Sequence, residues 1–303
     1  MAIGLDCDPT IVHFLKFCRR EGVEVDAINL REVAAVGSWN IHIGDGQSSL
    51  INVDGCEWNM LEYDAVYARP IDLTWSQQET PSRSRWFGMM SAVRAWLQTA
   101  DILVINRPMA GVHNSAKPLH EAFLAGLGFR VPDSVTSADP RTLREFVSSF
   151  SCILKSLSGT RGDTVAVTAD DLNGFVVQQG PLHVQRRIEG VDVRVHVLGD
   201  VVLSTMIDSR SVDYRAKGVK PKLSRWLLPI DLSEQVVAAT RRMGLTFAGW
   251  DFKVSSDGIY WCLEANPQPG YGMYDPVMEW GISRELVSIM TRAKAEKGVP
   301  GSP

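Results

Sequence analysis

The first third of the chain alternates between helical and strand-like spacing of its apolar residues. Residues 11–20 repeat apolar side chains at the interval of a helix, and residues 85–97 are apolar enough for a second helix. Residues 64–70 and 102–108 have the pattern of strands that end in polar loops. This alternation predicts an α/β lobe with a parallel sheet over residues 1–108.

Two arginines lie where the predicted strands of this lobe end. In parallel α/β sheets ligands bind at the carboxyl ends of strands, and a guanidinium can hold a carboxylate through two hydrogen bonds. We therefore expect Arg69 to bind the substrate. For Arg107 an ordinary structural role in its loop is the favoured interpretation.

Residues 114–127 repeat apolar positions at helical spacing, with Asn114 as the candidate cap and Gly128 after the last turn. Lys117, near the start of this helix, is placed to reach a phosphate, and a solvated side chain is an equally good interpretation. A further helix is expected from Asp139-Pro140, because proline suits the first turn of a helix.

An apolar strand at residues 151–155 carries Lys155 directly into a loop that contains Gly159 and Gly162. Glycines let backbone N–H groups approach phosphate oxygens, and the lysine supplies a point charge. The spacing differs from that of the P-loop. Taken alone, this segment is therefore only weak evidence for phosphate binding. Together with the acids described below, phosphate binding becomes the favoured interpretation.

Residues 182–188 and 191–197 are predicted to be successive strands. Asp192 and Arg194 share one face of the second strand. They can form an ion pair worth about 0.2–1 kcal/mol or serve a ligand, and the residues alone leave both interpretations open.

The segment FAGWDFKVSSDGIYWCLEAN, residues 247–266, predicts a β-hairpin that turns at Asp257-Gly258. With these two residues at the centre of a type I′ turn, Asp251 lies directly opposite Glu264, and their Cβ atoms are about 4.5–5.5 Å apart. Asn266 projects to the same face, because it lies two residues beyond Glu264. A four-residue loop keeps all three on this face as well.

Two carboxylates this close repel each other unless one is protonated or a cation lies between them. The alternative is a pair of incidental acids on a solvated face. Trp250, Phe252, Trp261 and Leu263 are expected on the opposite face, so both faces are covered and the acids need a partner. Two carboxylates and an amide oxygen suit Mg²⁺, and the hairpin therefore predicts a magnesium site.

Asp251 followed by Glu264-Ala265-Asn266-Pro267 resembles the metal signature of the ATP-grasp superfamily. The order of segments from Lys155 onward resembles the RimK-like branch, and within it the graspetide (microviridin-type) ligases that modify peptides. Asp213-Tyr214-Arg215 resembles a D-W-R triplet of that branch. The resemblance covers residues 64–290. The run at residues 267–272 departs from the family pattern, so the substrate edge of the site is expected to differ.

The resemblance implies an ATP-grasp fold of three lobes, in which the last two clasp ATP between antiparallel sheets. The implied lobes are residues 1–108, 109–184 and 185–303. The implied cofactors are ATP and Mg²⁺, with the metal held by Asp251, Glu264 and Asn266. The implied nucleotide contacts are Lys117, Lys155, Ser158, Gly159, Gly162, Gln185, Arg186, Arg187, Ile188, Asp192 and Arg194, where the backbone of residues 185–188 reads the adenine edge.

The leading hypothesis is an ATP-dependent carboxylate ligase that forms an amide or ester through an acyl phosphate, on Asp or Glu side chains of a ribosomal peptide. The alternatives are a RimK-like ligase of free amino acids or small molecules, an ATP-grasp kinase, and a non-catalytic peptide-binding module. Lys155, Arg194 and Arg215 are the expected catalytic residues, and Arg69, Asp213 and Arg215 are expected at the substrate. His183 and His196 lie within strands, which favours core positions for both.

Composition narrows the class of partner. The 303 residues are 45% hydrophobic and 22% charged with a formal net charge of −4, which is typical of a globular protein and lacks the basic surplus of a nucleic-acid-binding one. Five cysteines without a C-x-x-C pair argue against disulfides or zinc. We expect a cytoplasmic protein that binds a peptide or small acidic carboxylate, without nucleic acid or membrane partners, and leave a homodimer open.

Overall fold

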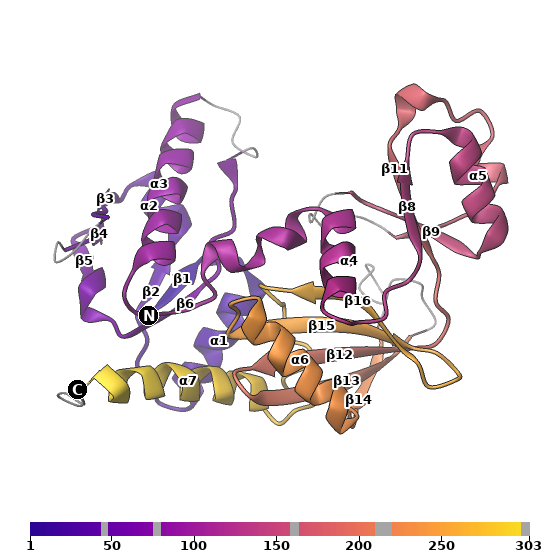
Figure 1. Cartoon of the computed structure of the whole chain (residues 1–303). Helices are drawn as coiled ribbons and strands as arrows, with labels where there is room; N and C mark the ends of the chain where they lie inside the picture. The colour runs from indigo at the N-terminus through magenta and orange to yellow at the C-terminus, as the bar shows by residue number, and fades with distance from the viewer. Residues whose placement is uncertain (44–47, 75–79, 158–163, 210–219, 298–303) are drawn as a thin grey trace. The chain divides into compact units, whose positions relative to one another are not determined.

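The computed structural model describes residues 1–43, 48–74, 80–157, 164–209 and 220–297, and the chain divides into two compact units (Figure 1). Unit 1 comprises residues 1–110, 241–247 and 268–303, and unit 2 comprises residues 111–240 and 248–267. Both sheets that the sequence assigned to the ATP-clasping lobes belong to unit 2. The three-lobe division of the sequence stays a prediction.

A parallel sheet forms the centre of unit 1, as the alternating pattern predicted. Its order is β2-β1-β6-β7, and each neighbouring pair is parallel. The strands are β1 (Ala2–Gly4), β2 (Ala27–Asn29), β6 (Ala65–Ala68) and β7 (Leu103–Ile105), and the helices of this unit are α1 (Pro9–Arg20), α2 (Leu30–Ala35), α3 (Thr80–Thr99) and α7 (Gly281–Lys297).

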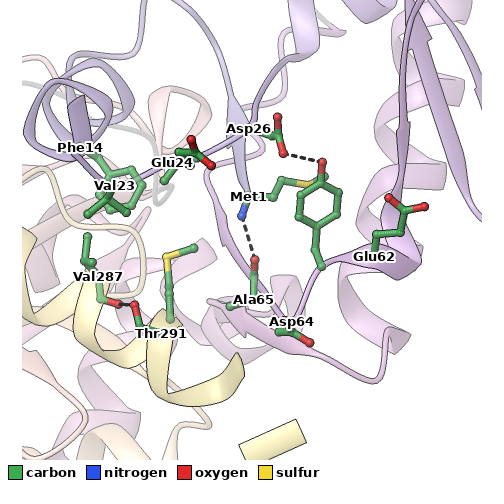
Figure 2. A pocket seen from close by; sticks show the side chains of 13 residues that line it. Met1, Phe14, Val23, Glu24, Asp26, Glu62, Asp64, Ala65, Val287 and Thr291 are labelled. Carbon is green, nitrogen blue, oxygen red and sulfur yellow. Dashed lines mark hydrogen bonds between the residues drawn. The ribbon is translucent and has the colours of Figure 1, made fainter. Parts of the chain in front are cut away.

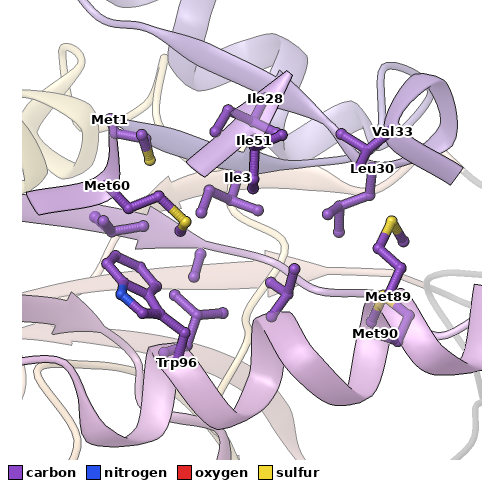
Figure 3. Close-up of a cluster of buried hydrophobic side chains, with 14 of the residues drawn as sticks. Met1, Ile3, Ile28, Leu30, Val33, Ile51, Met60, Met89, Met90 and Trp96 are labelled. Atoms are coloured by element: carbon purple, nitrogen blue, oxygen red, sulfur yellow. The ribbon is translucent and has the colours of Figure 1, made fainter. Parts of the chain in front are cut away.

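A second sheet of unit 1 was not predicted. It is antiparallel, in the order β3 (Ser38–Asn40), β4 (Leu50–Val53), β5 (Cys56–Asn59). Strands of three or four residues contain too few positions to show a clear alternation of apolar and polar side chains. Packing explains why they form: Ile51 of β4, Ile3 of β1 and Met89 of α3 meet in one buried cluster (Figure 3).

A cavity of about 400 Å³ opens at the amino ends of the parallel strands of unit 1 (Figure 2). The Tyr63 hydroxyl donates a hydrogen bond to Asp26 at 2.8 Å, and the Met1 ammonium donates to the Ala65 carbonyl at 3.1 Å. Burial lowers the pKa of this ammonium. Because ligands of such sheets bind at the carboxyl ends of the strands, this cavity is not the candidate active site.

Unit 2 contains two sheets. The first has the order β10-β9-β11-β8, and its registered pairs are antiparallel. The second has the order β14-β13-β12-β15-β16, in which β15 and β16 pair antiparallel. The strands are β8 (Ser134–Ser137), β9 (Cys152–Lys155), β10 (Val165–Val167), β11 (Leu182–Arg186), β12 (Val191–Leu198), β13 (Val201–Asp208), β14 (Lys222–Arg225), β15 (Phe247–Val254) and β16 (Tyr260–Asn266).

Three helices accompany these sheets: α4 (Lys117–Gly126), α5 (Pro140–Ser149) and α6 (Ile230–Arg242), whose last two residues belong to unit 1. α5 begins where the sequence predicted, since the Asp139 side chain caps it by accepting from the amides of Arg141 and Thr142. The predicted cap of α4 was wrong. Ala116 occupies the cap position without a side-chain bond, and Asn114 has a different role, described below.

Gly190 separates β11 from β12 and requires its lack of a side chain. Its φ is +148°, and a β-carbon there would clash with the carbonyl of Val254. Within the described segments, none of the helices combines the length and the hydropathy that a membrane crossing requires.

Arg107 has the structural role that the sequence favoured. Its guanidinium donates to the carbonyl oxygens of Leu97 and Gln98 in the last turn of α3, and to those of Ala100 and Ile102 beyond it, at 2.9–3.2 Å. Carbonyl groups in the last turn of a helix have no partner within the helix. Arg107 therefore satisfies the carboxyl end of α3.

Replacing Arg107 by Met should lower the free energy of unfolding by about 1.5–3 kcal/mol, because carbonyls that now accept from a charged group would lose that donor. Urea denaturation followed by circular dichroism measures the change. The matched control is Arg94→Met, within α3 itself, where the pair with Asp72 is 3.7 Å long and partly exposed; it should cost at most about 1 kcal/mol. Equal losses in the two variants would contradict the capping role.

Candidate active site

The predicted pairing of Asp251 with Glu264 is confirmed, although the predicted turn was wrong. Asp251 faces Glu264 across the hairpin, and Asn266 faces Gly249. Beyond the acids the register shifts, so that Val254 pairs with Tyr260. The offset comes from a β-bulge next to Asp251.

The loop of the hairpin differs from a type I′ turn. The Ser255 amide donates to the Ile259 carbonyl, and the Gly258 amide donates to the Ser255 carbonyl. Gly258 alone within this loop has a positive φ, +80°. This is a three-residue loop, which by itself would shift the register by one residue. The bulge restores the pairing of Asp251 with Glu264.

The bulge also changes which face Trp261 occupies. Trp250 and Phe252 are buried on the face opposite Asp251, as predicted. Trp261 pairs with Lys253 and therefore lies on the face of the acids, contrary to the prediction. The guanidinium groups of Arg130 and Arg186 lie 5.2 and 5.4 Å from its ring, within the range of cation–π contacts.

Each of the two carboxylates has a cation from another element. The Asp251 carboxylate accepts a hydrogen bond from Arg194 Nη1 of β12 at 2.8 Å. The Glu264 carboxylate accepts one from Lys117 Nζ at the start of α4 at 3.1 Å, and one from the Asn114 amide at 3.3 Å. These cations reduce the repulsion that the hairpin register creates.

The residues present fit a magnesium ion. Asp251 and Glu264 share one face, and their side chains are 13% and 19% exposed, so both are accessible from outside. Among the described residues no group of three or more His, Cys, Asp or Glu gathers as a metal site. Two carboxylates with the Asn266 amide leave room for waters and phosphate oxygens, as Mg²⁺ prefers.

Asn114, which the sequence predicted to be a helix cap, is instead a neighbour of the candidate metal ligand Glu264. Asn114 and Lys117 are three residues apart and both reach Glu264. Asn114 lies in a 3-10 segment that ends at Ser115, and the extended residue Ala116 precedes Lys117 at the start of α4. Helical spacing therefore does not explain why both side chains reach Glu264, and this target, about 150 residues away from Asn114 along the chain, was not visible in the sequence.

Lys155 lies beside a buried polar network centred on Glu121 of α4. Glu121 accepts hydrogen bonds from His183 at 3.0 Å, from Gln185 at 2.6 Å and from Ser134 at 2.6 Å. His183 pairs with Lys155 across β11 and β9. His183 and His196 are both buried, as the sequence favoured.

Burial and hydrogen bonding together shift the pKa values of Lys155 and Glu121. Burial lowers the pKa of Lys155 below the ordinary lysine value, although the negative charge of Glu121 acts in the opposite direction and raises it. Burial also raises the pKa of Glu121, but the hydrogen bonds from His183 and Ser134 outweigh it and the net shift is downward. Glu121 is therefore an anion that supports a charged Lys155.

Asp192 and Arg194 have partners on β15. Asp192 accepts from Lys253 Nζ and Arg194 donates to Asp251, both at 2.8 Å. In the expected adenine hinge, the amides of Arg186 and Arg187 donate to the carbonyls of Asp133 and Ser151. Reading of an adenine edge by residues 185–188, Ile188 included, would therefore use the remaining backbone groups.

Arg69 is committed to contacts within unit 1. It is 8% exposed; its Nε donates to Asp8 at 2.6 Å, and its Nη1 donates to the carbonyls of Gln268 and Pro269 at 3.0 and 3.3 Å. The structure thus gives it a role in holding the segment that follows the E-x-N-P run, and binding of substrate by Arg69 stays a prediction. The remaining expected site residues, Ser158, Gly159, Gly162, Asp213 and Arg215, lie outside the described residues.

Comparison with protein families gives one match that covers more than half of the chain. The family model of the RimK-like ATP-grasp domain matches residues 115–290. Among curated proteins, the tetrahydromethanopterin:alpha-L-glutamate ligase of Methanococcus maripaludis is 28% identical over 203 residues, or 61% of this chain and 68% of that protein.

Solved structures match nearly the whole chain. The macrocyclase MdnC of Microcystis aeruginosa, bound to its precursor peptide MdnA, superposes with a TM-score of 0.79 at 18% identity, covering 96% of this chain and 100% of that one. The ATP-grasp ligase PsnB, bound to a variant of its minimal precursor, Mg and ADP, superposes with a TM-score of 0.80 at 23% identity, covering 96% and 97%. At these identities the likeness is one of fold, and it confirms the fold that the resemblance implied.

The lowered pKa of Lys155 predicts a pH dependence of nucleotide binding. The charged amine attracts phosphate, so affinity for ADP should be full below this pKa and fall as pH rises through it, at a lower pH than for an ordinary lysine. Lys155→Arg should abolish the fall, because a guanidinium stays charged. Glu121→Gln should move the fall to lower pH. Calorimetric titrations across pH test this, and identical profiles for wild type and Lys155→Arg would remove Lys155 from the phosphate site.

Proposed function

The chain belongs to the RimK-like ATP-grasp family of ligases, and from this premise we propose that it activates Asp or Glu side chains of a peptide. In this proposal ATP phosphorylates the carboxylate to an acyl phosphate. An amine or hydroxyl then displaces phosphate to form an amide or ester. Its cofactors are ATP and Mg²⁺, as in the family.

The peptide substrate is supported by the extent of the structural match. MdnC and PsnB, both solved with precursor peptides, superpose over 96% of this chain, including the part before residue 115 that the family model does not reach. A fold shared over the whole chain favours a substrate of similar kind.

The charged residues of unit 2 have complementary roles in this proposal. Asp251, Glu264 and Asn266 would hold Mg²⁺, which offsets charge on the transferred phosphoryl group when bound. Lys155 and Arg194 would hold phosphate oxygens by charge. We assign stabilisation of the tetrahedral oxyanion to Arg215, which lies outside the described residues.

A second candidate is a ligase that joins free glutamate to a small acceptor. It is favoured by the sequence relatives, since the Methanococcus maripaludis protein named above is an alpha-L-glutamate ligase. The two candidates share the activation step and differ in the substrate, so substrate competition separates them.

Glu264→Gln should preserve the packing of the hairpin and remove one charge from the metal site. We expect Mg²⁺-dependent turnover to fall by at least about 100-fold without recovery at higher Mg²⁺. ATP consumption measured over a Mg²⁺ titration gives the result. The control is Glu285→Gln on α7, which removes an exposed pair with Arg292 and should leave turnover unchanged. Near-normal turnover in Glu264→Gln would refute the metal assignment.

The reaction should release ADP and phosphate and give a product lighter than its summed substrates by one water. A peptide that contains Glu, Asp, Lys and Thr, incubated with ATP and Mg²⁺, should show this loss by mass spectrometry. A product heavier by one phosphate would support a kinase, and AMP with pyrophosphate would support adenylation. Water loss only with free glutamate and a small amine would favour the second candidate.

A further inference from the structure

Two histidines form a buried chain that ends at the metal-binding strand. Nδ1 of His113 lies 2.9 Å from Nδ1 of His120, and Nε2 of His120 accepts a hydrogen bond from the backbone amide of Ala265 at 2.9 Å. His120 is 0% exposed and His113 is 9% exposed. Ala265 separates Glu264 from Asn266, the two expected ligands on β16.

The hydrogen bonds fix the tautomer of each ring. The Ala265 amide can only donate, so His120 Nε2 carries no proton and its Nδ1 does. This Nδ1–H donates to His113, whose proton must then be on Nε2. Burial lowers the pKa of His120 to about 4 and also lowers that of His113, so both rings are neutral at neutral pH and the order of bonds is kept.

The position of β16 explains why this amide needs a side chain. β16 is the outermost strand of its sheet, so an amide that points away from β15 has no strand partner. A buried amide without an acceptor costs about 1–3 kcal/mol. Its neighbour on the same edge, the Cys262 amide, is satisfied by the Arg130 carbonyl at 2.7 Å, whereas the Ala265 amide depends on His120.

His113, at the far end of this hydrogen-bonded pair, also differs from an ordinary core residue. The His113 ring lies edge to edge with that of His120, at a centroid distance of 5.1 Å and nearly parallel, and it stacks on Phe123 at 4.3 Å. Its buried Nε2–H finds no acceptor among the described residues. Buried donors without an acceptor are rare in protein interiors.

We propose that His120, oriented by His113, is a positioning residue of the metal site. It holds the Ala265 backbone, and with it the spacing between the Glu264 carboxylate and the Asn266 amide. Lys117 at the start of α4 and Asn114 in the segment before it hold the Glu264 side chain, so His120 adds the backbone contact to the same support. The inference rests on the proposed function only in taking Glu264 and Asn266 as ligands of Mg²⁺.

Two substitutions at His120 separate the bond to Ala265 from the bond to His113. Gln places its amide oxygen near the position of Nε2 and can still accept from Ala265, while Asn places its amide near Nδ1 and cannot. We expect His120→Asn to speed hydrogen exchange of the Ala265 amide and to weaken Mg²⁺-dependent ADP binding about 10–100-fold, as loss of outer-shell support does. His120→Gln should stay near wild type in both.

Calorimetry with ADP and Mg²⁺, NMR amide exchange and urea denaturation provide the readouts. His113→Asn, which keeps an acceptor near Nδ1, should resemble wild type, and His42→Gln in unit 1 is the remote control. Wild-type exchange and affinity in His120→Asn would overturn the inference, as would equal losses in the Asn and Gln variants. Absence of Mg²⁺-dependent ADP binding in the wild type would count against the proposed function, whereas the exchange data would still test the His120 bond.

Discussion

The candidate active site depends on one unfavourable contact, the pairing of Asp251 with Glu264 across the hairpin. At the separation of directly opposed strand residues, and with an effective dielectric constant of about 20, two negative charges repel by roughly 3 kcal/mol. Arg194 and Lys117 approach from β12 and α4 to offset this cost. Strand β12 and helix α4 thus supply the positive charges that stabilise two closely spaced carboxylates.

The sequence was sufficient to predict this pairing, but for a reason that was only partly correct. The two-residue turn was wrong, and the three-residue loop that replaces it would have moved Glu264 to the other face. A bulge beside Asp251 cancels that shift. No residue in the hairpin sequence predicts the bulge. Its consequence is seen at Trp261, which lies on the face of the acids and not on the opposite face, where it was predicted. Periodicity predicts faces well only where a strand is uninterrupted.

Arginines illustrate the part of the site that a sequence does not reveal. Arg69, Arg107 and Arg194 all lie at or within predicted strands, yet one holds a backbone segment, one caps a helix and one binds an acid of the candidate metal site. Their partners lie between 5 and 200 positions away along the chain. Local pattern identifies the donor, whereas only the fold identifies the acceptor. The parallel sheet of unit 1 and the β15–β16 hairpin were predictable because their signals are local.

Charge balance also connects metal and nucleotide binding. In unit 2 the anions Glu121, Asp251 and Glu264 are accompanied by the cations Lys117, Lys155 and Arg194. A metal ion alone would add positive charge to this balanced set, and a nucleotide alone would add negative charge. Together they disturb the balance less than either does separately. If these residues bind the nucleotide as proposed, the cations that offset the charge of the two acids also favour uptake of the metal and the phosphates together.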